Sequence, residues 1–390
     1  MFKRSPLLNF IKKIFLQLRI FISCSQSLII IACFISSKKK ITNNINLLCI
    51  NTERLGDLVL STDFLFCLGN HSCYQMKYLL IQDIYVSLFD WEKIGFSPLP
   101  INKTKYKKNL LYRLLFIHEI RKQEFLTIIN FTPERGWIND ELVMTSVAKE
   151  KIALKSSSIY LSSVILKYIN KKYSTIYDYG INNEYNKLNF LLEYYRIEKK
   201  IIKDALNFND EVLTSILKRV GSRKYICISP FTSDNKRTWG INNFIKLATY
   251  FESTLNFLIL GTKNEINSIQ AELQNASISM NKTNIFTCYD KDLGKIASII
   301  RNSLIFIGND SGLTHIAHNL EVPTIAIIGG GEYGRFFPYK DNPNTYYFYH
   351  QLDCFGCHWN CIYKEKYCLT NISVEMVIDK IKEIIEVNKN

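Results

Sequence analysis

The sequence contains, at residues 305–329, the run IFIGNDSGLTHIAHNLEVPTIAIIG, which decides the expected fold class. Its two apolar segments, 305–309 and 322–328, are bounded by Gly and Pro, a pattern typical of parallel strands covered on both faces. Between them, Asp310-Ser311-Gly312 opens a short helix. These residues either cap that helix or turn its first backbone N–H groups toward an anion such as a phosphate. The run therefore predicts an α/β protein with a candidate nucleotide site.

A second strand–turn–helix pattern lies far upstream, at residues 45–62, which read INLLCINTERLGDLVLST. Gly56 falls in the turn, and a helix is expected from Leu58 onward. Asp57 is then either the N-cap of that helix or a carboxylate that acts on a ligand, because ligands collect at the carboxyl ends of parallel strands. A third segment, residues 225–239, reads YICISPFTSDNKRTW, a strand followed by a polar loop.

Three motifs now stand in order along the chain: R-x-G-D-x-x-x-S from Arg54, K-x-x-W from Lys236, and D-S-G-x-x-H-x-A from Asp310. Together they resemble the glycosyltransferase family of bacterial lipopolysaccharide heptosyltransferases, over roughly residues 44 to 385. The resemblance implies an α/β protein of the GT-B fold, with two Rossmann-like, doubly wound parallel-sheet domains facing a central cleft. It also implies inverting, metal-independent transfer of a sugar, heptose from ADP-heptose, to a lipopolysaccharide core or related glycan.

Inverting transfer needs a base for the acceptor hydroxyl and positive charge for the departing diphosphate. In the resembling family the residue that matches Asp57 is the general base, and the one that matches Lys236 contacts the diphosphate. Arg237 is an alternative phosphate contact. On the acceptor side we expect Arg54 and Gly56, the latter because a glycine lets a ligand approach the backbone closely.

The expected donor site is larger. Backbone N–H groups at the start of the second helix would complete a diphosphate cradle, and the carboxylate of Asp310 would accept hydrogen bonds from sugar hydroxyls. The resemblance implies that His315 contacts the donor and that Glu265 binds the ribose, whereas His318 stands where the family has a small residue. The predicted donor-binding residues are Thr232, Lys236, Glu265, Asp310, Ser311, Gly312, Leu313 and His315.

A chain of 390 residues suggests more than one domain. Alternating strand and helix patterns predict a Rossmann-like acceptor-binding domain over 45–205 and a Rossmann-like nucleotide-sugar domain over 206–390, which ends in a helix near Val374–Val387. Residues 1–44 form a basic and apolar extension. Its apolar run, 28–35, is shorter than the ~20 residues that span a bilayer, so a membrane-surface helix is expected there.

Four of the 11 cysteines cluster in a loop, at Cys354, Cys357, Cys361 and Cys368. Four soft ligands at this spacing suit a structural zinc ion, while disulfides and free thiols remain alternatives. The transfer chemistry of the resembling family requires no cofactor.

The formal charge of +14 favours anionic partners. We expect a nucleotide sugar donor, a lipid-linked glycan acceptor and a membrane surface, with the protein cytoplasmic and peripheral on the inner face of the cytoplasmic membrane. Two alternatives stay open: a non-catalytic nucleotide-sugar or glycan-binding relative, and a basic nucleic-acid-binding protein with a zinc loop. No nucleic-acid recognition motif supports the second, so nucleic acid is not among the expected partners.

Overall fold

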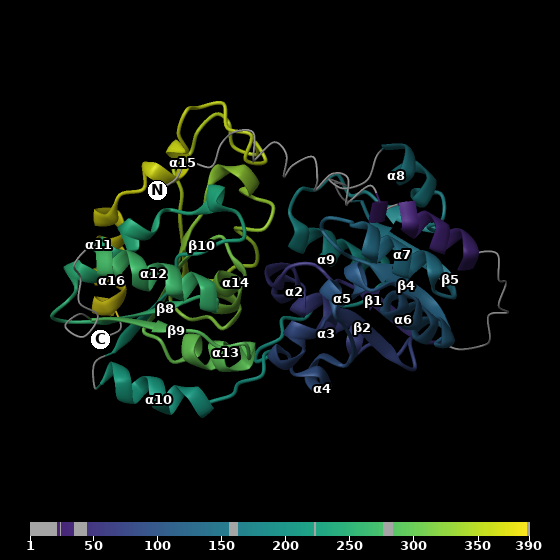
Figure 1. The fold of residues 1–390 in the computed structure, drawn as a ribbon, viewed down its shortest axis with the longest axis horizontal. Coiled ribbons are helices and arrows are strands. Elements are labelled where there is room, and N and C mark those ends of the chain that lie inside the picture. Colours follow the sequence, from purple (N-terminus) through teal and green to yellow (C-terminus); the bar gives the residue numbers. More distant parts are fainter. Residues whose placement is uncertain are drawn as a thin grey trace. The chain divides into compact units, whose positions relative to one another are not determined.

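The computed structural model of the chain describes residues 22–34 apart from residue 24, and residues 45–155, 163–221, 224–275 and 284–387. It divides into two compact units: 1–53, 69–86 and 95–180 form the first, and 54–68, 87–94 and 181–390 form the second. Each unit contains one sheet (Figure 1). The predicted domain limits at residues 44 and 205 remain predictions.

The first unit is built on a six-stranded sheet of order β3-β2-β1-β4-β5-β6, in which all neighbours are parallel. This is the doubly wound Rossmann order, and it reverses between β1 and β4, where ligands of such sheets bind beyond the carboxyl ends of the strands. The strands are β1 (Leu47–Ile50), β2 (Lys77–Gln82), β3 (Ser97–Ile101), β4 (Phe125–Asn130), β5 (Ala148–Leu154) and β6 (Thr175–Tyr177).

The second unit repeats the plan with the order β12-β11-β10-β7-β8-β9, again parallel throughout. Its reversal lies between β7 and β10, so the loops that follow these two strands flank the expected ligand position. The strands are β7 (Tyr225–Ser229), β8 (Asn256–Leu260), β9 (Ile285–Cys288), β10 (Ile305–Asn309), β11 (Thr324–Ile327) and β12 (Thr345–Phe348). Two doubly wound parallel sheets confirm the predicted α/β fold class.

Helices cover the sheets because the central strands are apolar on both faces. In the second unit, alternate residues of β7, β8, β10 and β11 pack in one core with α11, α12 and α16. The helices of the first unit are α5 (Lys103–Lys108), α6 (Leu110–Lys122), α7 (Trp137–Thr145) and α8 (Ser163–Asn170). Those of the second are α2 (Leu55–Leu60), α3 (Thr62–Gly69, its last residue excepted), α4 (Trp91–Ile94), α9 (Glu184–Tyr194), α10 (Glu211–Val220), α11 (Ile241–Tyr250), α12 (Lys263–Asn275), α13 (Leu293–Arg301), α14 (Gly312–Asn319), α15 (Tyr367–Thr370) and α16 (Val374–Val387).

In the described part of the N-terminal extension, residues 22–23 and 25–34 are helical. Its Ile30 and Ile31 are buried in the core of the first unit, and Phe34 packs beside them. This stretch is therefore a structural part of that unit, and the rest of the predicted extension lies outside the described residues. Across the described ranges, none of the helices combines the length and apolar character needed to cross a membrane.

Candidate functional site

Two loops meet at the reversal point of the second sheet. One follows β7, and the other follows β10 and begins with Asp310. The fully buried Asn309 holds them together: its Oδ1 accepts the Trp239 backbone N–H at 2.9 Å, and its Nδ2 donates to the Pro230 carbonyl oxygen at 2.7 Å. Asn309 thus fixes the loop that carries Lys236. The sequence analysis missed this role, although a polar residue at the end of an apolar strand was a visible signal.

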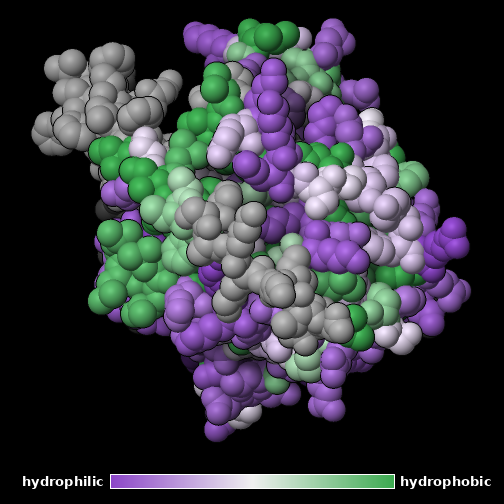
Figure 2. All heavy atoms as spheres, turned by 90° about the vertical axis from the view of Figure 1, so that its right-hand side faces the viewer, coloured by the Kyte–Doolittle hydropathy of each residue, from purple (hydrophilic) through white to green (hydrophobic). Residues whose placement is uncertain are grey.

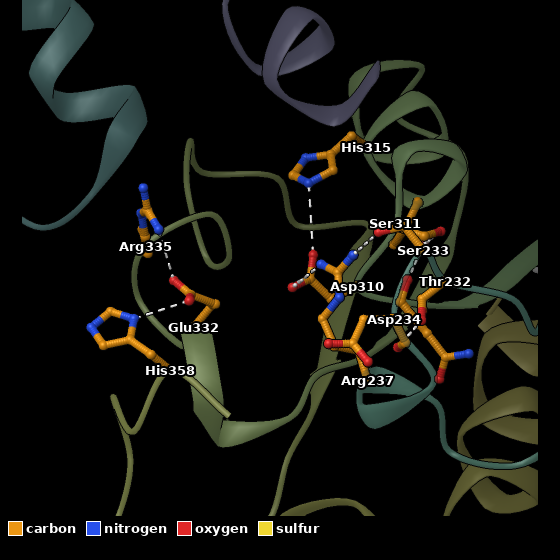
Figure 3. A network of polar contacts seen from close by, with 12 residues as sticks. Thr232, Ser233, Asp234, Arg237, Asp310, Ser311, His315, Glu332, Arg335 and His358 are labelled. Carbon is orange, nitrogen blue, oxygen red and sulfur yellow. Dashed lines mark hydrogen bonds and ion pairs between the residues drawn. The ribbon is translucent and has the colours of Figure 1, made fainter. Parts of the chain in front are cut away.

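Asp310 is buried between a cation and an imidazole (Figure 3). Its Oδ2 lies 3.7 Å from Nη1 of Arg237, and its Oδ1 lies 3.8 Å from Nε2 of His315. Burial raises the pKa of Asp310, and the Arg237 charge opposes that shift. Burial, with the charges of His318 and Arg237, lowers the pKa of His315 well below its ordinary value. His315 is therefore neutral at pH 7, and Arg237 is the cation that balances Asp310.

His315 is locked in place by its neighbours. Its ring stacks on Phe337, with centroids 4.0 Å apart and planes 16° apart, and its Nδ1 lies 3.1 Å from the Tyr339 hydroxyl oxygen. Its opposite edge faces Gly56, where an added Cβ would lie only 2.7 Å from Cδ2 of His315. His315 thus joins helix α14, which follows β10, to the Gly56-Asp57 segment far upstream in the sequence.

The predicted start of the first helix is wrong by three residues. Helix α2 begins at Leu55, so Asp57 lies inside its first turn, and a carboxylate oxygen of Asp57 accepts the Arg54 backbone N–H at 3.4 Å. The helix is set by packing rather than by an N-cap at Asp57: Leu55 lies against Gly312, where a Cβ would come within 3.0 Å. Segment 54–68 consequently packs with the second unit, next to Asp310 and His315. Arg54 is exposed, and its charge also acts on Asp310.

The two basic residues of the loop after β7 differ in orientation. Lys236 is exposed, and its backbone N–H is held by the Asp234 carboxylate at 3.0 Å. Arg237 turns inward to Asp310, and its Nη2 donates to the Ser233 hydroxyl at 2.8 Å (Figure 3). Thr232, half-buried, donates to the Asp234 carbonyl oxygen. Of these two basic residues, Arg237, the predicted alternative phosphate contact, is the one that contacts the buried Asp310 carboxylate.

The start of α14 is oriented as an anion site requires. Ser311 is its N-cap, in extended backbone conformation, and Gly312 and Leu313 open its first turn. The first backbone N–H groups of a helix have no partner within the helix, so those of residues 311–313 face outward from its positive end. Glu265 behaves differently: its carboxylate caps α12 by accepting both the backbone N–H and the hydroxyl of Thr262 at 2.8 Å. Its predicted ribose contact remains a prediction.

The structure gives no support to the predicted zinc site in the cysteine-rich loop. All four cysteines lie in the described part of the chain, and there no group of three or more His, Cys, Asp or Glu side chains is placed to hold a metal ion. Cys368 is buried in the core with Leu369, and Cys361 is exposed. The thiols are neighbours all the same: after burial, the other three thiols raise the pKa of Cys354, and Cys357 and Cys368 raise that of Cys361. The four residues are free thiols here.

The loop instead braces a glycine turn after β11. Trp359 packs so closely on Gly329 and Gly331 that a Cβ at either would lie 2.4–2.5 Å from its indole. The backbone N–H of His358 donates to the Gly331 carbonyl oxygen at 3.0 Å, and its Nδ1 lies 3.0 Å from a carboxylate oxygen of Glu332 (Figure 3). Glu332, whose charge acts on Asp310, is thereby held at the rim of the candidate site.

A second polar group lies at the carboxyl ends of the first sheet. The Nζ of Lys103 contacts Glu53 Oε2 and the Thr52 carbonyl oxygen, each at 2.9 Å. Gln82 donates to the Thr52 and Glu53 carbonyl oxygens at 2.8 and 2.6 Å, and Asn139 donates to Glu53 Oε1 at 3.1 Å. The sequence analysis treated Lys103 as part of a solvated basic run, because the strand ends that gather these residues are far apart in sequence.

We expect Gly56→Ala to lower turnover about tenfold or more. The new methyl group would clash with a His315 ring that Phe337 and Tyr339 hold in place, so α2 must shift, at an overpacking cost of about 1–3 kcal/mol. Gly136→Ala is the matched control, because its nearest neighbour would lie 3.7 Å away. Steady-state kinetics with circular dichroism measure the effect, and a Gly56→Ala enzyme within twofold of wild type would contradict the close packing.

Acid should weaken the fold through His318. Burial, then the charge of Lys340, lowers its pKa from 6.5 to about 4, so below pH 6.5 the unfolded chain binds the proton more readily than the folded one. The free energy of unfolding should therefore be undiminished above pH 6.5 and fall by about 3 kcal/mol between pH 6.5 and pH 4. Denaturant titrations across this range should show a shallower fall for His318→Gln, and equal slopes would contradict the assignment.

Residues 167–358 match the family model described as "Glycosyltransferase family 9 (heptosyltransferase)". Lipooligosaccharide heptosyltransferase 2 of Campylobacter jejuni subsp. jejuni serotype O:2 is 27% identical over 258 residues, which are 62% of this chain and 76% of that protein. A family 9 glycosyltransferase structure from Veillonella parvula has a TM-score of 0.70 at 16% identity and covers 89% of this chain and 99% of its own. The structure of E. coli ADP-heptose lps heptosyltransferase II has a TM-score of 0.62 at 12% identity, and the match covers 89% of this chain and 100% of that one.

Two Rossmann-like sheets, with an anion-type site at the reversal point of the second, define a glycosyltransferase of the GT-B fold. Within that class, residues 167–358 match glycosyltransferase family 9, the heptosyltransferases.

Proposed function

We propose that this enzyme transfers heptose from ADP-heptose, with inversion and without a metal ion, to the core of a lipopolysaccharide or a related lipid-linked glycan. The observation that carries the proposal is the packing of the Gly56-Asp57 turn on His315, which contacts the Asp310–Arg237 pair. The names of two similar proteins support the sugar and the acceptor class: one is a lipooligosaccharide heptosyltransferase, and the other is an ADP-heptose lps heptosyltransferase.

In this proposal Asp57 removes the proton from the acceptor hydroxyl as the new glycosidic bond forms. Arg237, Lys236 and the amides of Ser311, Gly312 and Leu313 balance the charge that grows on the leaving diphosphate. Arg237 is held in place by Asp310 and Ser233, so little reorganisation of this cation accompanies the reaction. Asp310 and Thr232 accept hydrogen bonds from the donor, and the neutral His315 keeps the turn and the donor loop in register.

The acceptor is assigned to Arg54 and Gly56. Within the first unit, the polar group around Glu53 and Lys103 is a separate candidate for contacts to a sugar. A carboxylate and an ammonium group 2.9 Å apart at the carboxyl ends of a parallel sheet suit the hydroxyl and acidic groups of a core oligosaccharide. The 45–205 and 206–390 domains then have acceptor and donor roles, respectively. We place the enzyme in the cytoplasm, peripheral on the inner face of the membrane.

Donor identity is tested by thermal shift with ADP-, GDP- and UDP-sugars, followed by turnover in excess EDTA. We expect ADP-heptose to give the largest shift and the chelator to leave turnover unchanged. Stabilisation by another nucleotide sugar alone would replace the donor, and donor binding without turnover would favour a non-catalytic binding relative. Loss of activity in EDTA would refute the metal-independent mechanism.

A further inference from the structure

Helix α6 exposes leucines and buries arginines, the reverse of an ordinary surface helix. Leu110, Leu111 and Leu115 are 55%, 66% and 56% exposed. On its buried face lie Arg113 and Arg121, at 2% and 9% exposure, beside Ile117 and Ile120.

The buried face fixes this orientation. The Arg113 guanidinium binds the fully buried Glu141 carboxylate through two nitrogens and lies 4.6 Å from the Trp137 ring centroid. Arg121 donates to the Thr145 carbonyl oxygen at 2.6 Å. Rotating the helix to bury its leucines would strand the buried Glu141 carboxylate without its cation, which is strongly unfavourable. The exposed leucines are therefore imposed by the fold and are available to another surface.

Lysines border these leucines. Lys105, Lys107 and Lys108 on α5 are exposed and directly precede Leu110 in the chain, and Lys122 ends α6. The one acidic residue of α5 and α6, Glu119, is paired with Lys122 at 2.7 Å. Figure 2 shows a side of the molecule where hydrophobic and strongly hydrophilic residues lie next to each other. Leucines that enter the acyl boundary, with lysines at the level of the headgroups, are typical of proteins that bind anionic membranes.

We propose that the α5–α6 surface, defined by Lys105, Lys107, Lys108, Leu110, Leu111 and Leu115, docks on an anionic lipid bilayer. The occupant follows from charge: a second copy of this chain would place lysines against lysines, whereas anionic headgroups complement them. This surface would be where the enzyme of the proposed function contacts the membrane, and the proposal rests on that function for the reason why the enzyme binds a membrane. Its test needs no turnover, so its failure leaves sugar transfer untouched.

The test is co-sedimentation of the full chain with vesicles of phosphatidylcholine alone or of equal parts phosphatidylcholine and phosphatidylglycerol. Wild type should bind only the anionic vesicles. The double variants Leu111→Gln/Leu115→Gln and Lys107→Gln/Lys108→Gln should each lower the partition coefficient about tenfold or more, with unchanged melting temperatures. The control Leu217→Gln/Lys218→Gln alters an exposed leucine (43%) and its neighbouring lysine on α10, and should bind like wild type.

Three results would overturn the proposal. Wild type that stays in the supernatant with both vesicle types would exclude lipid as the partner. Variant proteins that bind within twofold of wild type would move the contact to another segment, such as the N-terminal extension. A wild-type dimer that the leucine variant dissociates, with vesicle binding unaffected, would assign the surface to a second copy.

Discussion

Asp57→Asn should lower turnover by about a thousandfold while the dissociation constant of the donor changes less than about twofold. The carboxylate is expected to take the acceptor proton in the transition state, and an amide cannot. Asparagine keeps the size of the side chain and an oxygen that can still accept the Arg54 backbone N–H, so helix α2 should remain intact. Single-turnover kinetics together with donor titration by calorimetry separate the chemical step from binding.

The same substitution decides between the two roles that the sequence left open for Asp57. If the residue only stabilises the start of α2, Asn should serve nearly as well as Asp, and turnover close to wild type would remove the base assignment. Asp292→Asn is a matched control, because Asp292 caps α13 through the Gly294 backbone N–H at 2.9 Å. It should leave turnover unchanged.

The predictable part of the fold is the part that local pattern determines. Apolar runs located the strands at 225–229 and 305–309, and the run at 45–50 located β1, which spans Leu47–Ile50. The last helix occupies Val374–Val387 as predicted. The start of α2 was not predictable in this way. Gly56 looks like a turn residue in sequence, but it is helical because it packs on His315, a residue 259 positions away. Tertiary contact overrides the local preference of glycine at that point.

The candidate site shows the same limit. The motifs placed Asp57, Lys236 and Asp310 in order, yet spacing alone could not tell which of Lys236 and Arg237 faces inward. Asn309 and the Lys103–Glu53 pair became visible only when strand order brought distant loops together. The zinc prediction is not supported, because cysteine spacing alone does not show whether the thiols take up metal-binding geometry, and none of the described residues form such a group.

Arg237→Ala should have the second largest effect, with kcat/KM lower by about a hundredfold and donor binding weakened in parallel. The variant loses the cation beside Asp310 and leaves that carboxylate buried without its counter-charge. Burial already raises the pKa of Asp310. Lys236→Ala should lower kcat/KM only about tenfold, because the Lys236 side chain is exposed and water would screen its proposed contact with the diphosphate.

Arg237→Lys distinguishes charge from geometry. Lysine keeps the positive charge but loses the forked guanidinium, which contacts Asp310 through Nη1 and the Ser233 hydroxyl through Nη2. We therefore expect partial rescue of donor binding with little rescue of turnover. Donor binding needs a positive charge near the diphosphate, whereas stabilising the transition state needs that charge at the position that the guanidinium occupies. Kinetics that are normal in Arg237→Ala and severely impaired in Lys236→Ala would reverse the assignment: Lys236 would then hold the diphosphate, and Arg237 would serve only to neutralise Asp310.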